Sequence, residues 1–306
     1  MNPRIKTLQP IFPIILLVIT TVLYYQGKSA ELPNYPIKMT MFTTLRSKEA
    51  KFRTYSNTIR NWALFIPQIQ PILFAYETDD KLVDLATSLG WIVLEAPRVS
   101  PSKVPYLKEM YFAAEQHSKS VFYGYFNGDL LFDDGLIDSI LTLEKYVEQL
   151  KMPLVVGQRT NVPLRDRELW RKHEVTESAK EGKLFLLNAE DYFILHGNKF
   201  IWDGWEDVII GRPGYDNYFV ALALNHNLSA IDATQTILTV HQTGEDGTHA
   251  GFKDKDSKYN LEVLSHFNRT RGYVNNCPLM TKKNRHGKVE LWQRWPKKRV
   301  KRKHLT

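Results

Sequence analysis

The stretch Tyr123-Gly124-Tyr125-Phe126-Asn127-Gly128-Asp129-Leu130-Leu131-Phe132 places a hydrophobic strand directly before Asn-Gly-Asp. A strand this rich in aromatic residues is expected to be buried within a sheet. Its carboxyl end then lies at the edge where open α/β sheets bind their ligands. We therefore expect the chemistry of this protein to lie near Asp129.

Strand-like and helix-like segments alternate around this stretch, which predicts an α/β fold with a mixed, mainly parallel sheet flanked by helices. The expected strands are 37–43, 71–76, 91–95, 120–126, 153–157, 184–187 and 191–195, and the expected helices are 47–65, 81–89, 104–117, 134–150 and one that begins near 215. The sequence contains no internal repeat. We expect one domain over residues 37–284, after a short stem at 27–36.

Length and composition agree with a large folded domain. The chain has 306 residues, of which 43% are hydrophobic and 12% aromatic, so it can bury a sizeable core and is neither disordered nor fibrous. Cys277 is the single cysteine. The chain therefore forms no intrachain disulfide and no cysteine-based zinc cluster, and we expect Cys277 to be inert.

The N-terminus carries an apolar segment that predicts a membrane anchor. Residues 11–26 are uncharged and follow Arg4 and Lys6. Basic residues before such a run keep the N-terminus in the cytosol, so residues 1–10 would be a cytosolic tail and the rest of the chain would be lumenal. The run is shorter than the roughly 20 residues that cross an average bilayer, although a thinner membrane would accommodate it.

A cleaved signal peptide is the alternative to this anchor. Tyr25 and Lys28 stand where a cleavage site needs small side chains, which favours the anchor. Asn227-Leu-Ser and Asn268-Arg-Thr are glycosylation sequons, and they agree with a secretory route.

The C-terminal tail, residues 285–306, is strongly basic. Six of its Lys and Arg residues lie between Trp295 and His304, so a net charge of +8 for the chain leaves only +2 for the remainder. The domain itself is therefore not a basic nucleic-acid-binding surface, and no nucleic-acid partner is expected. The tail alone is compatible with a solvated end, a nuclear signal or a patch that binds anionic polymers.

Several signatures of nucleotide and ester chemistry are missing. The first expected strand ends in Phe42-Thr43-Thr44-Leu45-Arg46 and is not followed by the Gly-x-Gly-x-x-Gly of dinucleotide-binding proteins. The sequence also has no phosphate-loop Gly-Lys-Ser/Thr. It also lacks the Gly-x-Ser-x-Gly of α/β hydrolases. These three enzyme classes are disfavoured.

Three polar clusters remain after the acidic strand end: 189–193, 210–218 and 239–244. A divalent cation that binds a diphosphate needs protein ligands with room left for phosphate oxygens and water, so a carboxylate and an imidazole from separate loops form a plausible partial set. A sugar acceptor needs a carboxylate that takes the proton of its hydroxyl. This chain can supply both.

The order of these pieces resembles that of the GT-A glycosyltransferases, and more closely that of the nucleotide-diphospho-sugar transferase family. The matching pieces are 104–111, 127–131, 156–159, 191–193, 211–217 and 240–242, within about residues 37–260. The resemblance implies a Rossmann-like GT-A domain. It also implies that a nucleotide-sugar donor and a glycan or glycoprotein acceptor are the partners of the protein.

The resemblance assigns roles to individual residues. Asn127-Gly128-Asp129 would occupy the place of the Asp-x-Asp motif, with Asp129 and His241 holding Mn²⁺ or Mg²⁺. Asp216 would be the catalytic base, and Asp191, in an x-Glu-Asp-like triplet, is the competing candidate. The alternatives stay open: Asp129 as a turn residue, His241 as a structural histidine and Asp216 as a helix cap.

Contacts with the donor follow from the same resemblance. The expected donor-binding residues are Thr43, Thr44, Arg46, Lys108, Asn127 and Asp129, and Arg159 and Arg212 are similar candidates. Trp202, Trp205 and Tyr215 could stack on sugar rings or belong to the core.

The sequence thus predicts a metal-assisted glycosyltransferase of the Golgi or ER membrane, single-pass and type II, with its catalytic domain in the lumen. Asn127 leaves open a metal-independent transferase of the same fold, because it is an amide where the motif has an acid. A membrane-tethered glycan-binding protein without activity and a nuclear factor that uses the basic tail are further alternatives.

Overall fold

The computed structural model describes residues 37–46, 49–76, 80–164, 167–197, 205–244, 254, 256–267 and 272–295. The predicted cytosolic tail, anchor and stem lie outside these residues, as does most of the basic tail. Within the described ranges, no helix is both long enough and apolar enough to cross a membrane.

The described strands form one large sheet and one small sheet. The large sheet has nine strands in the order β13-β12-β10-β6-β9-β4-β1-β2-β3, and the small one has four in the order β5-β11-β7-β8. The strands of the large sheet are β1 (Ile37–Thr43), β2 (Ile69–Ala75), β3 (Ile92–Glu95), β4 (Ser120–Phe126), β6 (Leu154–Val156), β9 (Tyr192–His196), β10 (Ala230–Asp232), β12 (Leu279–Lys283) and β13 (Val289–Gln293). Those of the small sheet are β5 (Leu130–Phe132), β7 (Thr160–Pro163), β8 (Lys183–Leu184) and β11 (Thr239–Thr243).

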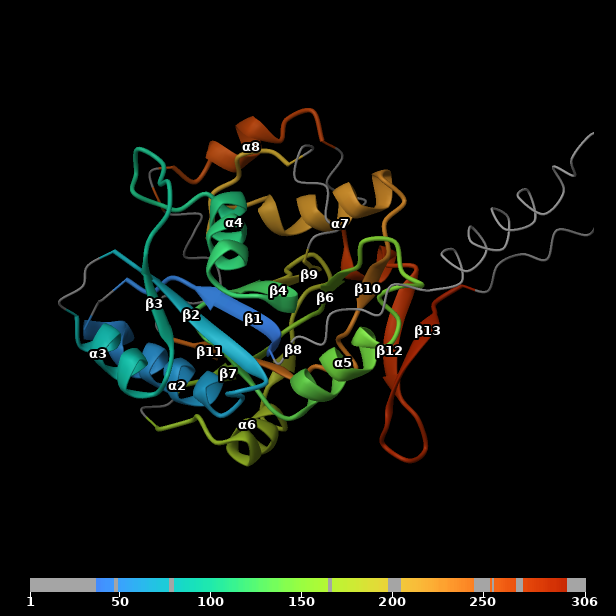
Figure 1. Cartoon of the computed structure of the whole chain (residues 1–306), viewed down its shortest axis with the longest axis horizontal. Coiled ribbons are helices and arrows are strands. Elements are labelled where there is room, and N and C mark those ends of the chain that lie inside the picture. Colours follow the sequence, from blue (N-terminus) through green and yellow to red (C-terminus); the bar gives the residue numbers. More distant parts are fainter. Residues whose placement is uncertain are drawn as a thin grey trace, which may run out of the picture. The chain divides into compact units, whose positions relative to one another are not determined.

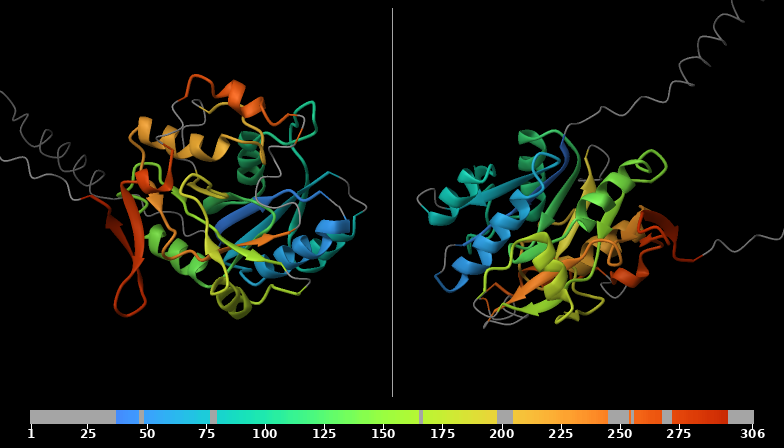
Figure 2. Two further views of the ribbon diagram at one scale, coloured as in Figure 1. Left: turned by 180° about the vertical axis from the view of Figure 1, so that it is seen from behind. Right: turned by 90° about the horizontal axis from the view of Figure 1, so that it is seen from below.

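The large sheet is mixed and mainly parallel, as the sequence predicts. β1 pairs in parallel with both β2 and β4, and β10 pairs in parallel with β6 and β12. β9 runs antiparallel between β4 and β6. β13 runs antiparallel to β12 at the end of the sheet, where the hairpin lies to one side in both Figure 1 and the left view of Figure 2.

Helices cover both faces of this sheet, as Figure 1 shows. The helices are α2 (Phe52–Ala63), α3 (Lys81–Ser88), α4 (Leu107–His117), α5 (Gly135–Glu144), α6 (Lys172–Ala179), α7 (Tyr215–Asn225) and α8 (Tyr259–Val263), with short 3-10 turns at Glu49–Lys51 and Val274–Asn276. α4 packs on β4 and β1, and α7 packs on β6 and β10. α2 and α5 lie on the opposite face, where α2 contacts β5 and α5 contacts β1.

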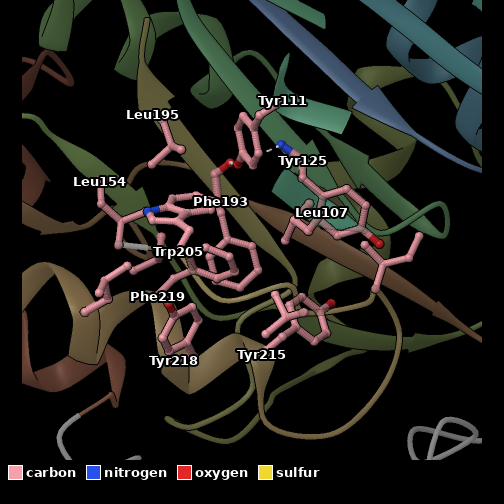
Figure 3. Packing of buried hydrophobic residues seen from close by; sticks show 14 of the residues in the cluster. Leu107, Tyr111, Tyr125, Leu154, Phe193, Leu195, Trp205, Tyr215, Tyr218 and Phe219 are labelled. Atoms are coloured by element: carbon pink, nitrogen blue, oxygen red, sulfur yellow. Dashed lines mark hydrogen bonds between the residues drawn. The ribbon is translucent and has the colours of Figure 1, made fainter. Parts of the chain in front are cut away.

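The core between the sheet and α4 and α7 is aromatic. Phe193 packs against Phe219 with ring centroids 4.9 Å apart, and Trp205 packs against Phe219 at 4.5 Å (Figure 3). Tyr111 donates its hydroxyl proton to the carbonyl of Phe193 at 2.5 Å. Trp205 is therefore a core residue. Trp202, the other tryptophan considered for sugar stacking, lies outside the described residues.

Element boundaries agree with the sequence prediction at β1 and β4, and they differ by one residue at each end of β6 and β9. β1 and β4 span the predicted residues, and every residue of β4 is buried. The helix expected at 134–150 ends instead at Glu144, and turns follow it. The predicted end of the domain at 284 falls inside the β12–β13 hairpin, because Lys283 pairs with Val289.

Candidate functional site

A cavity of about 580 Å³ opens at the carboxyl ends of β1 and β4. Its walls come from loops that are distant in the sequence: the segments after β1 and β4, the segment before β9, the start of α7, and β11. The predicted site residues that line it are Thr44, Arg46, Asn127, Asp129, Asp191, Asp216 and His241. The fold therefore brings together most of the polar residues singled out from the sequence.

Asp129 and His241 form a pair at the floor of this cavity. Asp129 Oδ2 lies 3.2 Å from His241 Nε2. The pairing of β5 with β11 fixes this contact, since Leu130 stands opposite His241 and the Gln242 amide donates to the carbonyl of Asp129 at 3.1 Å. Asp129 lies in a turn, as its alternative interpretation held, and this turn also presents its carboxylate to the cavity.

The environment keeps Asp129 ionised. Burial alone would raise the pKa of Asp129, but the charge and hydrogen bond of His241, together with Arg159 and Lys51, lower it to about 2. His241 is itself oriented by Thr243, whose Oγ1 lies 3.2 Å from His241 Nδ1. The pair is thus a fixed anionic site with an imidazole beside it.

This pair fits part of a divalent cation site. Asp129 Oδ1 is buried and has no hydrogen-bond partner, so one carboxylate oxygen remains available to a ligand. Carboxylate oxygen and imidazole nitrogen are both accepted by Mn²⁺. Among the described residues, however, no cluster of three or more His, Cys, Asp or Glu side chains could hold a metal. A cation here would therefore need most of its ligands from a diphosphate and water.

Asn127 is engaged with protein partners rather than being free for a ligand. Its Oδ1 accepts hydrogen bonds from the hydroxyls of Tyr125 at 3.0 Å and Tyr215 at 3.2 Å. Its amide donates to Asp191 Oδ1 at 2.7 Å. The amide can both donate and accept, which a second carboxylate could not do. Asn127 thus ties β4 to the start of α7 and to the segment before β9.

Asp191 is buried in an ion pair. Its Oδ2 lies 2.5 Å from Arg159 Nη1, and the side chains of Asp191 and Arg159 are only 9% and 6% exposed. Arg159 also donates to Asn161 Oδ1 at 3.0 Å and lies over the ring of Phe185 at 4.4 Å. With both oxygens occupied, Asp191 is poorly suited to accept a proton from an acceptor.

Asp216 lies at the start of α7. Gly214, with φ of +99°, precedes the helix, and this left-handed backbone favours glycine. Asp216 Oδ1 accepts a hydrogen bond from the Asn217 amide at 2.9 Å, so it satisfies one helix-terminal donor while it faces the cavity. Burial is the main cause that raises the pKa of Asp216 to about 7, and the negative charge of Asp191 adds to it.

The remaining predicted donor contacts divide into two groups. Thr44 and Arg46 line the cavity, and Arg46 lies over the ring of Tyr76 at 5.0 Å and donates to the carbonyl of Lys103 at 2.7 Å. Thr43 is fully buried, and its hydroxyl has no partner, but it does not line the cavity.

Lys108 is not brought to the cavity. Its ammonium donates to the carbonyl of Trp205 at 3.3 Å and lies 3.6 Å from Asp207. Arg212 does line the cavity, but its guanidinium is paired with Asp254 at 2.8 Å and with Asp256. The sequence motif contained both residues, whereas the direction of each side chain depends on tertiary partners.

Sequence reasoning missed Lys51 and did not assign Glu190 a role. Lys51 lines the cavity from the end of the 3-10 turn before α2. Glu190 lines it from the segment before β9 and is 1% exposed. The position of Glu190 beside Asp191 was the one available signal. Lys51 had none, because it lies in an ordinary surface-like stretch.

Comparisons with known proteins give structural neighbours but no family. No protein-family model matches the chain, and a search of curated proteins finds no match. Among solved structures, glucosyl-3-phosphoglycerate synthase from Mycobacterium tuberculosis, in complex with phosphoglyceric acid, is 11% identical over 84% of this chain and 87% of that one, with a TM-score of 0.43. A mannosyltransferase from Pyrobaculum calidifontis, in complex with GDP-Man and Mn²⁺, is 11% identical over 85% and 80%, with a TM-score of 0.41.

A third neighbour, TarS 1–349 from S. aureus in complex with UDP-GlcNAc, is 8% identical over 43% of this chain. The match spans only 36% of that structure, with a TM-score of 0.32. These neighbours are nucleotide-sugar glycosyltransferases, the class that the motifs resemble. At such identities and TM-scores, the likeness does not decide what this chain binds or transfers.

Proposed function

We propose that this protein is a glycosyltransferase that moves a sugar from a nucleotide-diphospho-sugar donor to a hydroxyl of a glycan or glycoprotein. One observation carries the proposal: a single cavity holds the Asp129–His241 pair with its unpartnered oxygen and, from the start of α7, the half-buried carboxyl of Asp216. The first arrangement suits the diphosphate end of a donor. The second suits a hydroxyl acceptor.

Cationic side chains would stabilise the leaving diphosphate. Arg46 and Lys51 line the cavity, and Arg159 lies deeper, paired with Asp191. Positive groups that are already in place when negative charge develops on the leaving group lower the barrier of such reactions. The unpartnered hydroxyl of Thr44 adds a hydrogen-bond donor at the same wall.

Asp129 and His241 would hold Mn²⁺ or Mg²⁺. When bound, the cation would supply neutralisation of the charge on the diphosphate. The protein's own contribution is to keep Asp129 ionised by placing His241 and Arg159 near it, and to leave Asp129 Oδ1 without a protein donor.

Asp216 would accept the proton of the acceptor hydroxyl. The acceptor oxygen forms a bond to the anomeric carbon while the bond from that carbon to the diphosphate oxygen breaks, and the bonding electron pair leaves with the diphosphate. A base works best when its pKa lies near the working pH, and burial brings the pKa of Asp216 to about 7. Asp191 remains committed to Arg159 and Asn127.

A metal-independent transferase of the same fold is the second candidate. The side-chain amide of Asn127 favours it, because this amide is hydrogen-bonded to Tyr125, Tyr215 and Asp191. The described side chains also contain no cluster of three or more His, Cys, Asp or Glu residues that could hold a metal. A protein of this shape that binds glycans without turning them over is the third outcome of the experiment below.

The proposed setting is the Golgi or ER membrane, with the catalytic domain in the lumen. The uncharged run at 11–26 after Arg4 and Lys6 supports it. Protease treatment of sealed microsomes tests this topology. Protection of the whole domain is expected, and digestion of the domain in intact microsomes would contradict it.

Turnover of nucleotide sugars tests the function. The full chain in detergent is incubated with a panel of UDP-, GDP- and CMP-sugars, with and without Mn²⁺, and release of the nucleotide is measured. Turnover of one donor that rises with Mn²⁺ supports the metal-assisted transferase, and equal turnover without the metal supports the metal-independent form. No turnover of any donor, with no thermal shift by any nucleotide, would contradict transfer.

A further inference from the structure

Asn217 connects the proposed base to a second carboxyl group. Its backbone amide donates to Asp216 Oδ1 at 2.9 Å, and its side-chain Nδ2 lies 3.3 Å from Glu190 Oε2. The same Nδ2 also approaches the carbonyls of Asn188 at 3.2 Å and Gly272 at 3.4 Å. Asn217 is therefore held by two other segments, the one before β9 and the one at Gly272, and it connects Glu190 and Asp216, which both line the cavity.

Glu190 is buried, and no cationic side chain among the described residues forms an ion pair with it. It is 1% exposed, and its Oε1 has no hydrogen-bond partner. Burying an ionised carboxylate is costly unless it is paired, so such groups usually keep their proton. The neighbouring Asp191 differs, because Arg159 pairs with it directly.

The surroundings of Glu190 and Asp216 raise the pKa values of the two carboxyl groups by different amounts. Burial, followed by the charge of Asp216, raises the pKa of Glu190 well above its usual value, and Asp191 adds to this effect. The pKa of Asp216 is about 7, because Arg159 and the Asn217 amide partly offset the burial and the charge of Asp191. Asp216 thus gives up its proton before Glu190 does.

We infer that Glu190 keeps its proton and acts as a positioning residue for Asp216, the two being joined through Asn217. This inference rests on the proposed function of the cavity. Because Glu190 is neutral, it adds no second negative charge beside the base, and its O–H offers a donor at the cavity wall. Only Asp216 is then ionised for proton transfer, and the proton of the acceptor hydroxyl ends on Asp216.

Two substitutions separate this role from a catalytic one. Glu190→Gln keeps the shape and the neutral, hydrogen-bonding character, so we expect kcat within about threefold of the wild type and the acidic limb of the pH–rate profile unchanged near pH 7. Glu190→Ala opens a space that water can fill beside Asp216. We expect it to lower kcat about tenfold or more through misplacement of the base, and to move the acidic limb to lower pH.

The opposite pattern would overturn the inference. If Glu190 were the ionised base, Glu190→Gln would lose activity as completely as Asp216→Asn. If Glu190 were ionised beside Asp216, Glu190→Gln would remove a repulsive charge and shift the acidic limb downward. A purely structural role would lower the melting temperature of the variants without moving the pH profile, and that result also contradicts the inference.

A spectroscopic measurement works even if no donor is turned over. Infrared difference spectra of the full chain are recorded for the wild type and Glu190→Gln at about pH 7.5. A carbonyl stretch of a protonated carboxylic acid is expected in the wild-type-minus-variant difference spectrum, because the contribution of the partly protonated Asp216 is common to both proteins. No such difference would show that Glu190 is ionised and would refute the inference. Absence of turnover alone would instead reject the proposed function.

Discussion

At the scale of single residues, the site depends on four acidic side chains that differ in their hydrogen-bond and charge partners. Among the described residues, Asp129 has a histidine beside it and one open oxygen, and Asp191 has an arginine. Asp216 accepts a hydrogen bond from the Asn217 amide, and Glu190 forms no ion pair with any described side chain. Environments that push the pKa values of carboxyl groups apart define distinct roles within one site. Under the proposed function, they separate an acid that binds a ligand (Asp129), an acid held in an ion pair (Asp191), a base (Asp216) and a neutral neighbour (Glu190).

If Asp129 holds the metal ion, Asp129→Ala should lose the stabilisation of the fold that comes from binding a nucleoside diphosphate with Mn²⁺. For a nucleoside diphosphate with Mn²⁺ at about a hundredfold above its Kd, binding should stabilise the wild type by about 2.7 kcal/mol. Asp129→Ala should lose the part of the melting-temperature shift that requires Mn²⁺. Asp138→Ala, an exposed aspartate on α5, is the matched control and should keep it. An undiminished Mn²⁺-dependent shift in Asp129→Ala would remove Asp129 from the metal site.

The raised pKa of Asp216 predicts a stability effect of Asp216→Asn that depends on pH. Because the pKa is about 7 in the folded chain against an ordinary value of 3.8, the folded state binds more protons between these values, and stability falls as pH rises through this range. The variant has no charge to bury, so it should be more stable than the wild type at pH 8 by roughly 1–3 kcal/mol, after allowance for screening in the open cavity.

At about pH 3, the difference between Asp216→Asn and the wild type should nearly vanish, since this pH lies below the ordinary pKa of 3.8 and Asp216 is then mostly protonated in both the folded and the unfolded state. Urea unfolding at both pH values measures it. A variant that is less stable than the wild type at pH 8 would show that the charge of Asp216 is stabilised in the fold. That outcome would contradict the assignment of Asp216 as a base with a raised pKa.

At the scale of elements, the start of α7 positions the base. The chain turns into α7 through Gly214, and the loop at Gly272 lies against the backbone of the first turn. A Cβ at Gly272 would collide with the carbonyl of Asn217, which is main chain and cannot rotate away. The position of α7 thus depends on a loop more than fifty residues further along the chain.

Gly272→Ala should therefore displace the first turn of α7. We expect a loss of kcat of about tenfold or more, because a shift of about 1 Å in a reacting group has effects of this size. Gly287→Ala is the control. Gly287 has a φ of +76°, which is strained for alanine, but a Cβ there would meet no other atom. Gly287 lies in a hairpin turn and does not line the cavity. Gly287→Ala should cost about 1 kcal/mol of stability and leave kcat unchanged. Equal effects of the two variants on kcat would contradict this role of Gly272.

The sequence predicts elements best where burial alone decides them. β1 and β4 begin and end as expected, and β4 stops where its apolar run meets the turn residues Asn127-Gly128-Asp129. α5 is shorter than its pattern, since the residues after Glu144 form turns. The small sheet depends on pairing between distant strands such as β7 and β11, which no local pattern reveals.

In the site, too, local sequence patterns reveal some features, whereas contacts between distant segments decide others. Asp129 directly precedes β5 and Asp216 lies in the first turn of α7, so both could be found at the ends of recognisable elements. His241 lies in the middle of β11, and only the resemblance of its Val-His-Gln motif pointed to it. The directions of Lys108 and Arg212 could not, because Asp207, Asp254 and Asp256 decide them. The partners of Asn127 likewise come from three separate segments.

At the scale of the whole molecule, the large sheet brings these parts to one edge. Parallel strands β1 and β4 end side by side, and the small sheet carries His241 to Asp129, while α7 closes the opposite wall. The groups proposed to bind the diphosphate and the acceptor thus come from different elements and line one cavity. A transferase requires this arrangement, since the donor and the acceptor must be bound together.

Nucleotide release from the best donor, compared between the wild type and Asp216→Asn, tests the central claim most directly. At saturating donor and acceptor and about pH 8, the variant should lose on the order of a hundredfold or more in kcat. Its affinity for the donor, measured by calorimetry, should stay within about threefold of the wild type, as expected for a residue that acts on the acceptor. Full activity of Asp216→Asn, or a wild type that releases no nucleotide from any donor, would contradict the account.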